Sequence, residues 1–301
     1  MRVLVAGGTG LIGRSLIREL LAAGHDVVVL TRRPQEARAV LPPGVGVRGW
    51  SPPEPLESSV LAGTDAVVNL AGAGIARRWT DAAKREILSS RTAATTALIQ
   101  AMQTLSARPR VLVNASAVGY YGPRGDEIVT ETDLPGDDFL AQVCREWEAA
   151  ATGAEALGVR VVRLRIGLVL GRGGALSRMS LPFRFFVGGP MGSGQQWMPW
   201  IHMDDLTGLV RFALDNDGLS GPVNGTAPNP VRNGDFALAL GRVLRRPAAL
   251  RTPAAALRLV FGEMAGMLLT GQRAIPQAAL AAGYRFRYQE LVPALEAIYA
   301  H

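Results

Sequence analysis

The chain has little of several residue types that mark particular protein classes. Its 301 residues include one cysteine, Cys144, three histidines and a single lysine, Lys84. One cysteine excludes an internal disulfide and a cysteine-based zinc cluster, and the scattered histidines give no metal signal. No apolar run approaches the roughly 18 residues that a membrane-spanning helix needs, and no secretory signal precedes the first strand. We therefore expect a cytoplasmic protein with no metal and no membrane partner.

Aromatic residues are also few, at 6%, while the formal net charge is +7. The basic residues are dispersed along the chain, and the few aromatics that accompany them do not form base-stacking platforms. We therefore expect no nucleic-acid partner. A hydrophobic fraction of 48% against 19% charged residues indicates a globular chain that buries a large core.

Strands and helices alternate over about the first 170 residues. Apolar residues at helical spacing predict a helix over 12–23, and the continuous apolar run DVVVLT predicts a buried parallel strand over 26–31. The alternation predicts an α/β fold with a doubly wound parallel sheet, the Rossmann arrangement. The other predicted strands are 3–5, 66–71, 110–116 and 159–167, and the other predicted helices are 80–105 and 138–157.

The character of the sequence changes after Gly171. Residues 171–200 are rich in glycine, proline, methionine and aromatics and show no regular period, so we expect an irregular segment that covers a site. Helices are expected near 204–216, 232–245 and 289–300. We therefore divide the chain into a dinucleotide-binding domain, 1–170, and a smaller mixed substrate lobe, 171–301. This division allows the chain to pass between the two parts more than once.

The stretch VAGGTGLIG, residues 5–13, lies between the first strand and the first helix. In that context Gly7 permits a tight turn, Gly10 lets the backbone approach a pyrophosphate, and Gly13 allows close helix packing. The phosphate charge then meets the helix N-terminus. The alternative is an ordinary glycine-rich turn. We interpret the stretch as a dinucleotide-binding site.

The second predicted strand ends in Thr31-Arg32-Arg33. An enzyme that selects NAD places an acidic residue there for the ribose hydroxyls, whereas two guanidinium groups match a 2′-phosphate. The predicted coenzyme is therefore NADP(H). The alternative is that both arginines are solvated surface charges.

Six motifs are spread along the chain: the G-x-x-G-x-x-G spacing, NLAG (69–72), NASAVGYYG (114–122), RIGLVLGRGG (165–174), PWIHMDDL (199–206) and LLTGQRAIPQAALAAGY (268–284). These motifs resemble the short-chain dehydrogenase/reductase superfamily in its extended, epimerase-like branch. Together they resemble one subgroup of the NAD-dependent epimerase/dehydratase superfamily, the epimerase family proteins, over essentially the whole length.

The resemblance implies hydride transfer assisted by a helical Tyr-x-x-x-Lys pair. Counting back from Glu148, which fits the acidic residue after that pair, places Leu140 and Cys144 at the two positions. The only lysine has Thr80 four residues before it, so no such pair exists in the chain. The usual proton relay is absent.

Other residues are therefore considered for the chemistry. Ser116 ends the fifth strand, where its hydroxyl can bind a substrate oxygen or satisfy local backbone. The resemblance favours Tyr121 as a substitute proton donor, Tyr120 competes with it, and either can be a structural aromatic. Cys144 lies by position near the nicotinamide, although a single buried thiol is usually inert.

His202 can shuttle protons with Asp204 or Asp205, but the resemblance favours a structural role, with the following aspartate as a helix N-cap. Arg91 lies on a helix that passes the coenzyme in the family, and Arg165 ends the sixth strand near a substrate anion; either can be a surface charge. A group of aromatic and other apolar residues either forms the wall of an apolar substrate pocket or belongs to the ordinary core. This aromatic group consists of Trp197, Met198, Pro199, Trp200, Phe183, Phe185 and Phe186.

These observations predict a NADP(H)-dependent oxidoreductase or epimerase acting on a small carbonyl or sugar-like molecule. The alternative is a non-catalytic NADP(H)-binding redox sensor or regulator, linked to cell division as older family names suggest. The resemblance implies a homodimer through the helices at 80–105 and 138–157. Ser116 and Tyr121 are the predicted catalytic residues. The predicted coenzyme-binding residues are Gly7, Thr9, Gly10, Leu11, Ile12, Gly13, Thr31, Arg32, Arg33, Leu70, Ala71, Gly72, Arg91, Ser116, Cys144 and Ile166.

Overall fold

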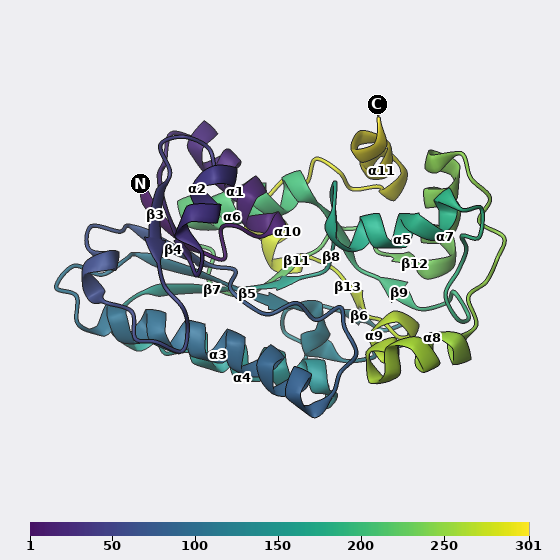
Figure 1. Ribbon diagram of the computed structural model, residues 1–301, viewed down its shortest axis with the longest axis horizontal. Helices are drawn as coiled ribbons and strands as arrows, with labels where there is room; N and C mark the ends of the chain where they lie inside the picture. The colour runs from purple at the N-terminus through teal and green to yellow at the C-terminus, as the bar shows by residue number, and fades with distance from the viewer. Residues whose placement is uncertain (301) are drawn as a thin grey trace.

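A seven-stranded parallel sheet forms the centre of the protein, which we describe from a computed structural model of residues 1–300 (Figure 1). Its strand order is β11-β7-β5-β4-β1-β2-β3, with the first strand near the middle, as in doubly wound folds. The α/β fold class predicted from the sequence is confirmed. The strands are β1 (Arg2–Ala6), β2 (Asp26–Thr31), β3 (Gly46–Gly49), β4 (Ala66–Asn69), β5 (Val111–Ala117), β7 (Arg160–Ile166) and β11 (Gly221–Gly225).

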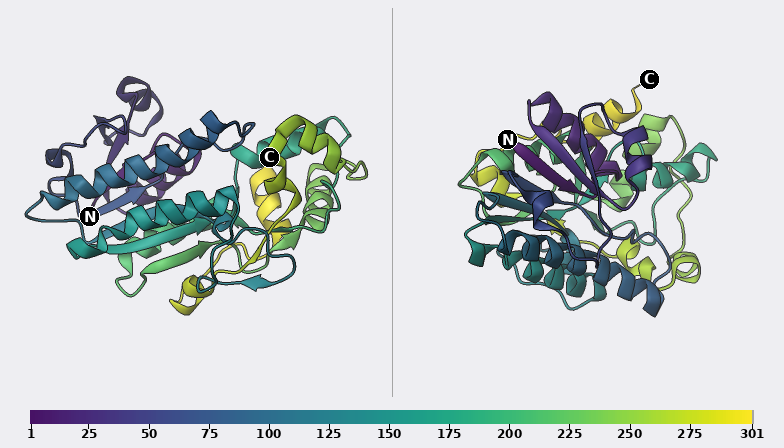
Figure 2. Two further views of the ribbon diagram at one scale, coloured as in Figure 1. Left: turned by 90° about the horizontal axis from the view of Figure 1, so that it is seen from below. Right: turned by 60° about the vertical axis from the view of Figure 1, so that its left-hand side comes forward.

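Helices cover both faces of this sheet (Figures 1 and 2). Alternate residues of β1 point to opposite faces: Val3 and Val5 pack with α1 (Leu11–Ala22) and α6 (Met203–Asp215), whereas Leu4 packs with α3 (Asp81–Gln103). The helix α4 (Phe139–Thr152) lies beside α3 on that second face. Burial on both faces explains why the strands are continuous apolar runs. Smaller elements complete this part: α2 (Pro34–Val40), η1 (Ser58–Leu61), η2 (Val118–Tyr121), η3 (Glu155–Leu157) and α10 (Gln277–Ala281).

The small lobe lies at one end of the sheet and has its own core, in which Trp200, Phe236 and Leu295 are buried (Figure 2). Helix α5 (Gly174–Arg184) corrects our expectation that 171–200 is irregular throughout. Three two-stranded pairs support the lobe: β8 with β10, β9 with β12, and β6 with β13. The remaining elements are β6 (Ile128–Val129), β8 (Leu168–Leu170), β9 (Trp197–Met198), β10 (Trp200–His202), β12 (Val231–Arg232), α7 (Asn233–Leu244), α8 (Ala254–Phe261), η4 (Gly262–Met264), α9 (Ala265–Leu269), β13 (Arg273–Ala274) and α11 (Leu291–Tyr299).

The chain passes between the two parts more than once. After β8 enters the small lobe, α6 returns to pack on α1, and β11 adds the last strand of the large sheet. Conversely, β6 lies between β5 and α4 in sequence but pairs with β13 near the C-terminus. The dinucleotide-binding part is therefore not confined to residues 1–170.

Candidate functional site

The loop between β1 and α1 has little room for side chains. Gly7 has a φ of +80°, and a Cβ there would lie 2.7 Å from the carbonyl carbon of Leu70. At Gly13 a Cβ would lie 2.5 Å from the carbonyl oxygen of Gly7. Backbone thus passes against backbone at both positions, which is the close approach that the glycine spacing predicts.

Helix α1 presents its first turn at this loop. Gly10 precedes the helix with extended backbone, and no side chain caps the helix. The first N–H groups of an α-helix have no intrahelical acceptor, so those of Leu11, Ile12 and Gly13 are directed at the space beyond the loop. Thr9 stands in the loop itself. Uncapped N–H groups and the positive end of the helix dipole suit a phosphate.

The end of β2 places three predicted residues beside this loop. Thr31 is half-buried, and its hydroxyl accepts the N–H of Arg33 at 3.2 Å. Arg32 and Arg33 are both exposed. Arg33 pairs with Glu36 at 3.2 Å, whereas Arg32 has no ion-pair or hydrogen-bond partner within residues 1–300. The free guanidinium is therefore that of Arg32.

A buried amide network holds the turn after β4, where Leu70, Ala71 and Gly72 lie. Asn69 accepts the N–H of Ala71 at 3.2 Å and donates to Asn114 at 2.7 Å and to Thr95 at 2.9 Å. The sequence analysis missed these three side chains. Their signal is an asparagine in each of two neighbouring, largely apolar strands, Asn69 at the end of β4 and Asn114 within β5, where an unpaired amide would be costly.

Arg91 reaches this turn from α3. Its guanidinium stacks 5.1 Å from the Trp147 ring centroid and lies 3.1 Å from where a Cβ of Gly72 would stand. One of its nitrogens donates to the carbonyl of Ile87 at 2.8 Å. Burial lowers the pKa of Arg91 from its usual value, and the nearby Cys144 opposes this shift. Arg91 therefore lies beside the Leu70–Gly72 turn, and its contact with the coenzyme stays a prediction.

Ser116 lies inside the protein. Its hydroxyl donates to Glu148 at 2.7 Å, and the residue is 2% exposed. Glu148 also receives two hydrogen bonds from Arg165, at 2.8 and 2.9 Å, and both side chains of this ion pair are nearly fully buried. Burial lowers the pKa of Arg165, but its hydrogen bonds to Glu148 and its proximity to Tyr121 outweigh burial and raise it. Arg165 is an internal cation and faces no substrate anion.

Tyr121 belongs to the same interior network. The residue is fully buried, and its hydroxyl donates to Asn224 at 2.7 Å and accepts from Arg165 at 3.0 Å. Burial raises the pKa of Tyr121 to about 12. In this arrangement the hydroxyls of both Tyr121 and Ser116 are engaged by internal partners, whereas the sequence suggested that they act on a substrate.

Of the two adjacent tyrosines after β5, Tyr120 is the one with an available hydroxyl. It is half-buried at the C-terminal end of β5, and its hydroxyl has no hydrogen-bond partner among residues 1–300. The guanidinium of Arg165 lies 3.4 Å from the centroid of its ring, and the Tyr121 ring meets it edge-on at 5.4 Å. The ring is therefore held in place while the phenol oxygen stays free.

Leu140 and Cys144 lie on the face of α4 that packs against the segment following β5. The Cys144 sulfur is 3.6 Å from the carbonyl oxygen of Ala117, and Leu140 packs against Gly119. Burial, with the nearby Glu148, raises the pKa of the Cys144 thiol to about 11, so the thiol stays protonated at neutral pH. Ile166 ends β7 beside Ala117.

His202 begins α6. Its Nδ1 accepts the N–H of Asp204 at 3.1 Å, so His202 itself is the N-cap, and the aspartate expected in that role is not. Asp205 instead accepts the N–H groups of Arg287 and Tyr288, at 2.7 and 2.9 Å, which anchors the C-terminal segment. Both contacts hold backbone in place, which is the kind of role that the resemblance favoured.

The aromatic group expected around a substrate pocket is dispersed. Phe183 and Trp200 are core residues of the small lobe. Trp197 is half-buried, and the guanidinium groups of Arg232 and Arg273 lie 4.7 and 4.6 Å from its ring centroid. Phe185 and Phe186 project into solvent, so they wall no pocket in this structure.

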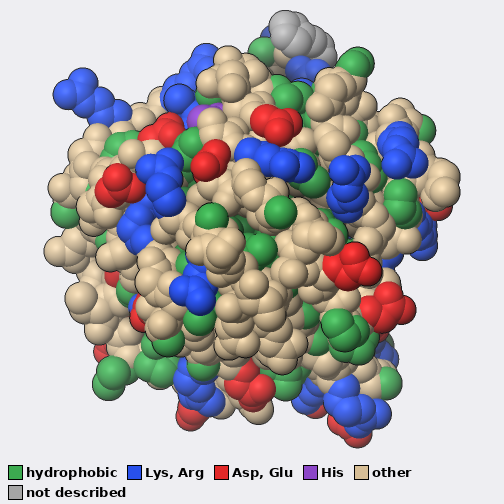
Figure 3. All heavy atoms as spheres, turned by 90° about the vertical axis from the view of Figure 1, so that its left-hand side faces the viewer, with side chains coloured by type: hydrophobic (Ala, Val, Ile, Leu, Met, Phe, Trp, Pro, Cys, Tyr) green, Lys and Arg blue, Asp and Glu red, His purple; other side chains and the backbone are tan. Residues whose placement is uncertain are grey.

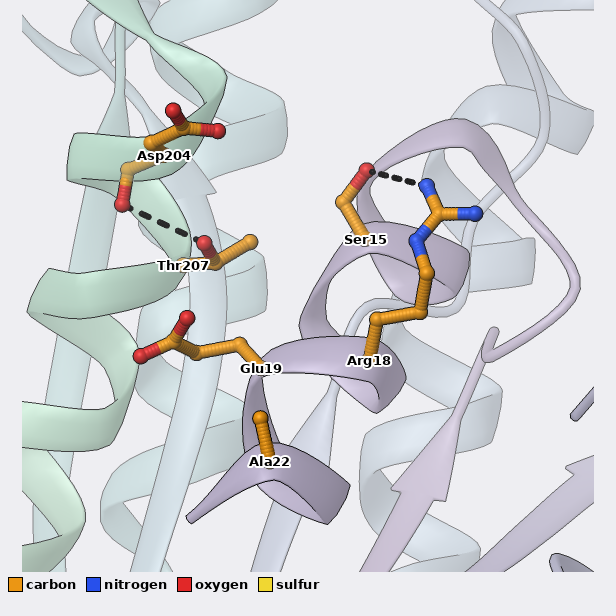
Figure 4. A pocket seen from close by; sticks show the side chains of 6 residues that line it. All are labelled: Ser15, Arg18, Glu19, Ala22, Asp204 and Thr207. Carbon is orange, nitrogen blue, oxygen red and sulfur yellow. Dashed lines mark hydrogen bonds between the residues drawn. The ribbon is translucent and has the colours of Figure 1, made fainter.

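A polar surface pocket lies between α1 and α6 (Figure 4). There Arg18 donates to the Ser15 hydroxyl at 3.4 Å, and Thr207 donates to the carbonyl of Asp204. The α1 residues of this pocket begin beyond the first helical turn, so it is distinct from the glycine cradle. Its lining residues are Ser15, Arg18, Glu19, Ala22, Asp204 and Thr207. Within residues 1–300, no cluster of three or more potential metal ligands occurs, and no helix is long and apolar enough to span a bilayer.

The sheet order and the glycine cradle define a nucleotide-binding Rossmann protein. The model of the NAD dependent epimerase/dehydratase family matches residues 3–224, and a domain of unknown function, DUF1731, matches residues 252–298. The chain belongs to the NAD dependent epimerase/dehydratase family.

Particular relatives resemble the chain over its whole length. The Arabidopsis thaliana "Epimerase family protein SDR39U1 homolog, chloroplastic" is 45% identical, with coverage of 99% of this chain and 86% of the relative. The Bacillus subtilis (strain 168) epimerase family protein YfhF is 38% identical, with 100% and 98% covered. The crystal structure of human epimerase family protein SDR39U1 (isoform 2) with NADPH superposes with a TM-score of 0.87 at 39% identity, covering 100% of this chain and 99% of that one.

Proposed function

We propose that this chain binds NADP(H) at the carboxyl ends of β1, β2 and β4. The observation that carries the proposal is the backbone cradle at Gly7 and Gly13, which packs backbone against backbone beside the uncapped N-terminus of α1, an arrangement that suits a diphosphate. The human relative crystallised with NADPH, similar along its whole length, supports the choice of coenzyme.

The residues present fit the parts of this coenzyme. The N–H groups of Leu11, Ile12 and Gly13 would hold the diphosphate, and the free guanidinium of Arg32 would hold the 2′-phosphate. Arg33 would also bind the 2′-phosphate once its ion pair with Glu36 is broken. Breaking that pair costs little free energy, because both of its side chains are exposed. When bound, the coenzyme supplies or accepts a hydride.

The test is calorimetric titration with NADPH and with NADH. Arg32→Glu is expected to weaken NADPH binding about 10- to 100-fold, since a charged hydrogen bond contributes about 1.5–3 kcal/mol, and to leave NADH binding nearly unchanged. Arg38→Glu makes the same charge change on an exposed residue of α2 and is the matched control. Equal affinities of the unaltered protein for the two coenzymes would contradict the 2′-phosphate assignment.

We propose further that the protein is an oxidoreductase or epimerase for a small carbonyl or sugar-like substrate, with an altered proton relay. The one lysine, Lys84, is engaged with Glu263, and Cys144 is a buried thiol, so neither takes the part of the usual lysine. Tyr120 replaces Tyr121 as the proposed proton donor, because its hydroxyl is the one left free at the end of β5. Tyr120→Phe should abolish NADPH-dependent turnover in a carbonyl panel and leave the NADPH affinity unchanged.

One observation favours a second function, that of a coenzyme-binding sensor: the hydroxyls of Ser116 and Tyr121 both form hydrogen bonds inside the protein. A protein that binds NADP(H) without turnover, as a redox sensor or regulator, needs no exposed acid. Tight NADPH binding with no turnover across the panel would favour the sensor, and turnover abolished by Tyr120→Phe would exclude it.

Two expectations about the whole protein remain proposals. A cytoplasmic location and a homodimer paired through α3 and α4 follow from the sequence and the family resemblance. Sedimentation velocity on the protein with and without NADPH tests the dimer.

A further inference from the structure

Helix α5 ends in an unusual way. Phe186 follows the helix with a φ of +63°, its N–H donates to the carbonyl of Phe183 at 2.9 Å, and the N–H of Val187 donates to that of Pro182 at 3.0 Å. These two bonds define a Schellman motif, in which the left-handed position is usually glycine. A phenylalanine there is strained.

Helix α7 ends in the same way. Arg245 has a φ of +54°, its N–H donates to the carbonyl of Arg242 at 3.1 Å, and the N–H of Arg246 donates to that of Gly241 at 2.8 Å. Phe186 and Arg245 are the only non-glycine residues with positive φ in residues 1–300. Backbone strain of this kind collects at functional sites.

The two strained helix ends lie side by side. The Arg246 guanidinium is 4.8 Å from the centroid of the Phe186 ring, and the N–H of Leu250 donates to the carbonyl of Gly188 at 3.2 Å. Phe185 is 70% exposed and Phe186 58%. We call this exposed surface the lobe tip; it comprises Leu181, Arg184, Phe185, Phe186, Val187, Arg245, Arg246 and Leu250.

The two sequence stretches that form the lobe tip carry basic charges only, and one carboxylate, that of Glu296 in α11, lies nearby in a surface pocket that it lines with Arg242 and Arg245. Residues 172–203 and 236–262 contain no aspartate or glutamate, but three and five arginines respectively. Eight of the twelve exposed large apolar side chains of residues 1–300 lie in these two stretches. By contrast, the left-hand end of the molecule in Figure 1, opposite the small lobe, shows acidic and basic side chains intermixed (Figure 3). The side chains of the lobe tip offer guanidinium donors and apolar groups, with no carboxylate, amide or hydroxyl.

We propose that the lobe tip binds the surface of a bilayer containing anionic lipids. Aromatic and aliphatic side chains enter the interface of a bilayer while neighbouring arginines bind its phosphates, and this pairing is typical of interfacial anchors. Phenylalanine and arginine are also enriched at protein–protein interfaces, so a contact with a second copy of the chain is the competing outcome of the test below. The sequence led us to expect no membrane partner because no segment can span a bilayer, but binding at the surface needs no such segment. The proposal does not depend on the coenzyme.

The test is co-sedimentation of the full chain with phosphatidylcholine vesicles, with and without phosphatidylglycerol. We expect binding only to the anionic vesicles, and weaker binding as salt is raised. Arg246→Gln should weaken partitioning about fivefold. Phe186→Gly should weaken it about tenfold or more while raising the Tm, because glycine relieves the left-handed strain. Leu134→Ala, which alters an exposed leucine outside the lobe tip, should bind as the unaltered protein does.

Retention of NADPH affinity in each variant shows that the fold is intact. The proposal is overturned if anionic vesicles fail to pellet the protein, or if Phe186→Gly and Arg246→Gln bind as well as the unaltered chain. It is also overturned if sedimentation velocity shows a dimer that Phe186→Gly dissociates, since the lobe tip would then be a contact between two copies.

Discussion

Replacing Arg165 with methionine would remove the cation at the centre of the interior network. Arg165 donates two hydrogen bonds to Glu148, one to the Tyr121 hydroxyl and one to the carbonyl of Glu131. Breaking a buried ion pair by removing one partner costs about 3–5 kcal/mol, because the other charge stays buried. Glu148 would keep Ser116 at 2.7 Å and Arg163 at 3.9 Å, so we expect a loss near the lower limit, about 3 kcal/mol.

Urea unfolding, followed by far-ultraviolet circular dichroism and tryptophan fluorescence together, measures this loss. Arg211→Met is the matched control: Arg211 and Glu19 also lie 2.8 Å apart, but their side chains are 44% and 35% exposed. Solvent screens such a pair, so its loss should cost at most about 1 kcal/mol. The double variant Arg165→Met/Glu148→Met should lose less than the two single variants summed. If Arg165→Met loses no more stability than Arg211→Met, burial does not set the strength of this pair.

Three further outcomes are expected. Burial, with the nearby Glu148, raises the pKa of Cys144 to about 11, so the thiol of the native protein should not react with Ellman's reagent at pH 8. One thiol per chain should react after unfolding in guanidinium chloride. A fast reaction of the native protein would contradict the burial of Cys144. Burial lowers the pKa of His202 from its usual 6.5. The stabilisation that neutral His202 provides is therefore complete above pH 6.5 and decreases as the pH falls below it. His202→Asn retains a capping oxygen but does not titrate, so its thermal unfolding should lose this acid sensitivity. Gly13→Ala places a Cβ 2.5 Å from the Gly7 carbonyl oxygen, so it should destabilise the fold by about 1–3 kcal/mol and weaken NADPH binding in calorimetry; an unchanged affinity would refute the cradle.

Long periodic or continuously apolar segments could be predicted from the sequence alone. DVVVLT forms β2 with the predicted bounds, and the helix expected over 12–23 is α1, one residue earlier. The strands β3 and β11 were missed, because GVRG and GPVNG contain glycine and polar residues and become strands only through their neighbours in the sheet. Helix α5 was missed because glycines begin it and Pro182 lies inside it.

The coenzyme side of the site was more predictable than the substrate side. The glycine roles depend on local backbone geometry, which spacing encodes. The orientation of two adjacent tyrosines does not follow from spacing, because the short helix η2 turns Tyr121 inward and leaves the Tyr120 hydroxyl free. The partner that buries Tyr121 is Asn224, 103 residues further along the chain, and the sequence carries no sign of this contact.

The interior network connects the coenzyme end of the sheet to the small lobe. Asn224 of β11 accepts from the Tyr121 hydroxyl, donates its own N–H to Glu131, and donates its side-chain amide to the carbonyl of Ile275. Every one of these groups is buried or half-buried, so breaking one bond would leave an unpaired polar atom inside the protein. These bonds join the segment after β5 to the segment after β13 through Asn224. An enzyme would use this linkage to keep Tyr120 aligned with the coenzyme, whereas a sensor would use it to carry coenzyme occupancy into the lobe, and the two functions call for the same buried residues.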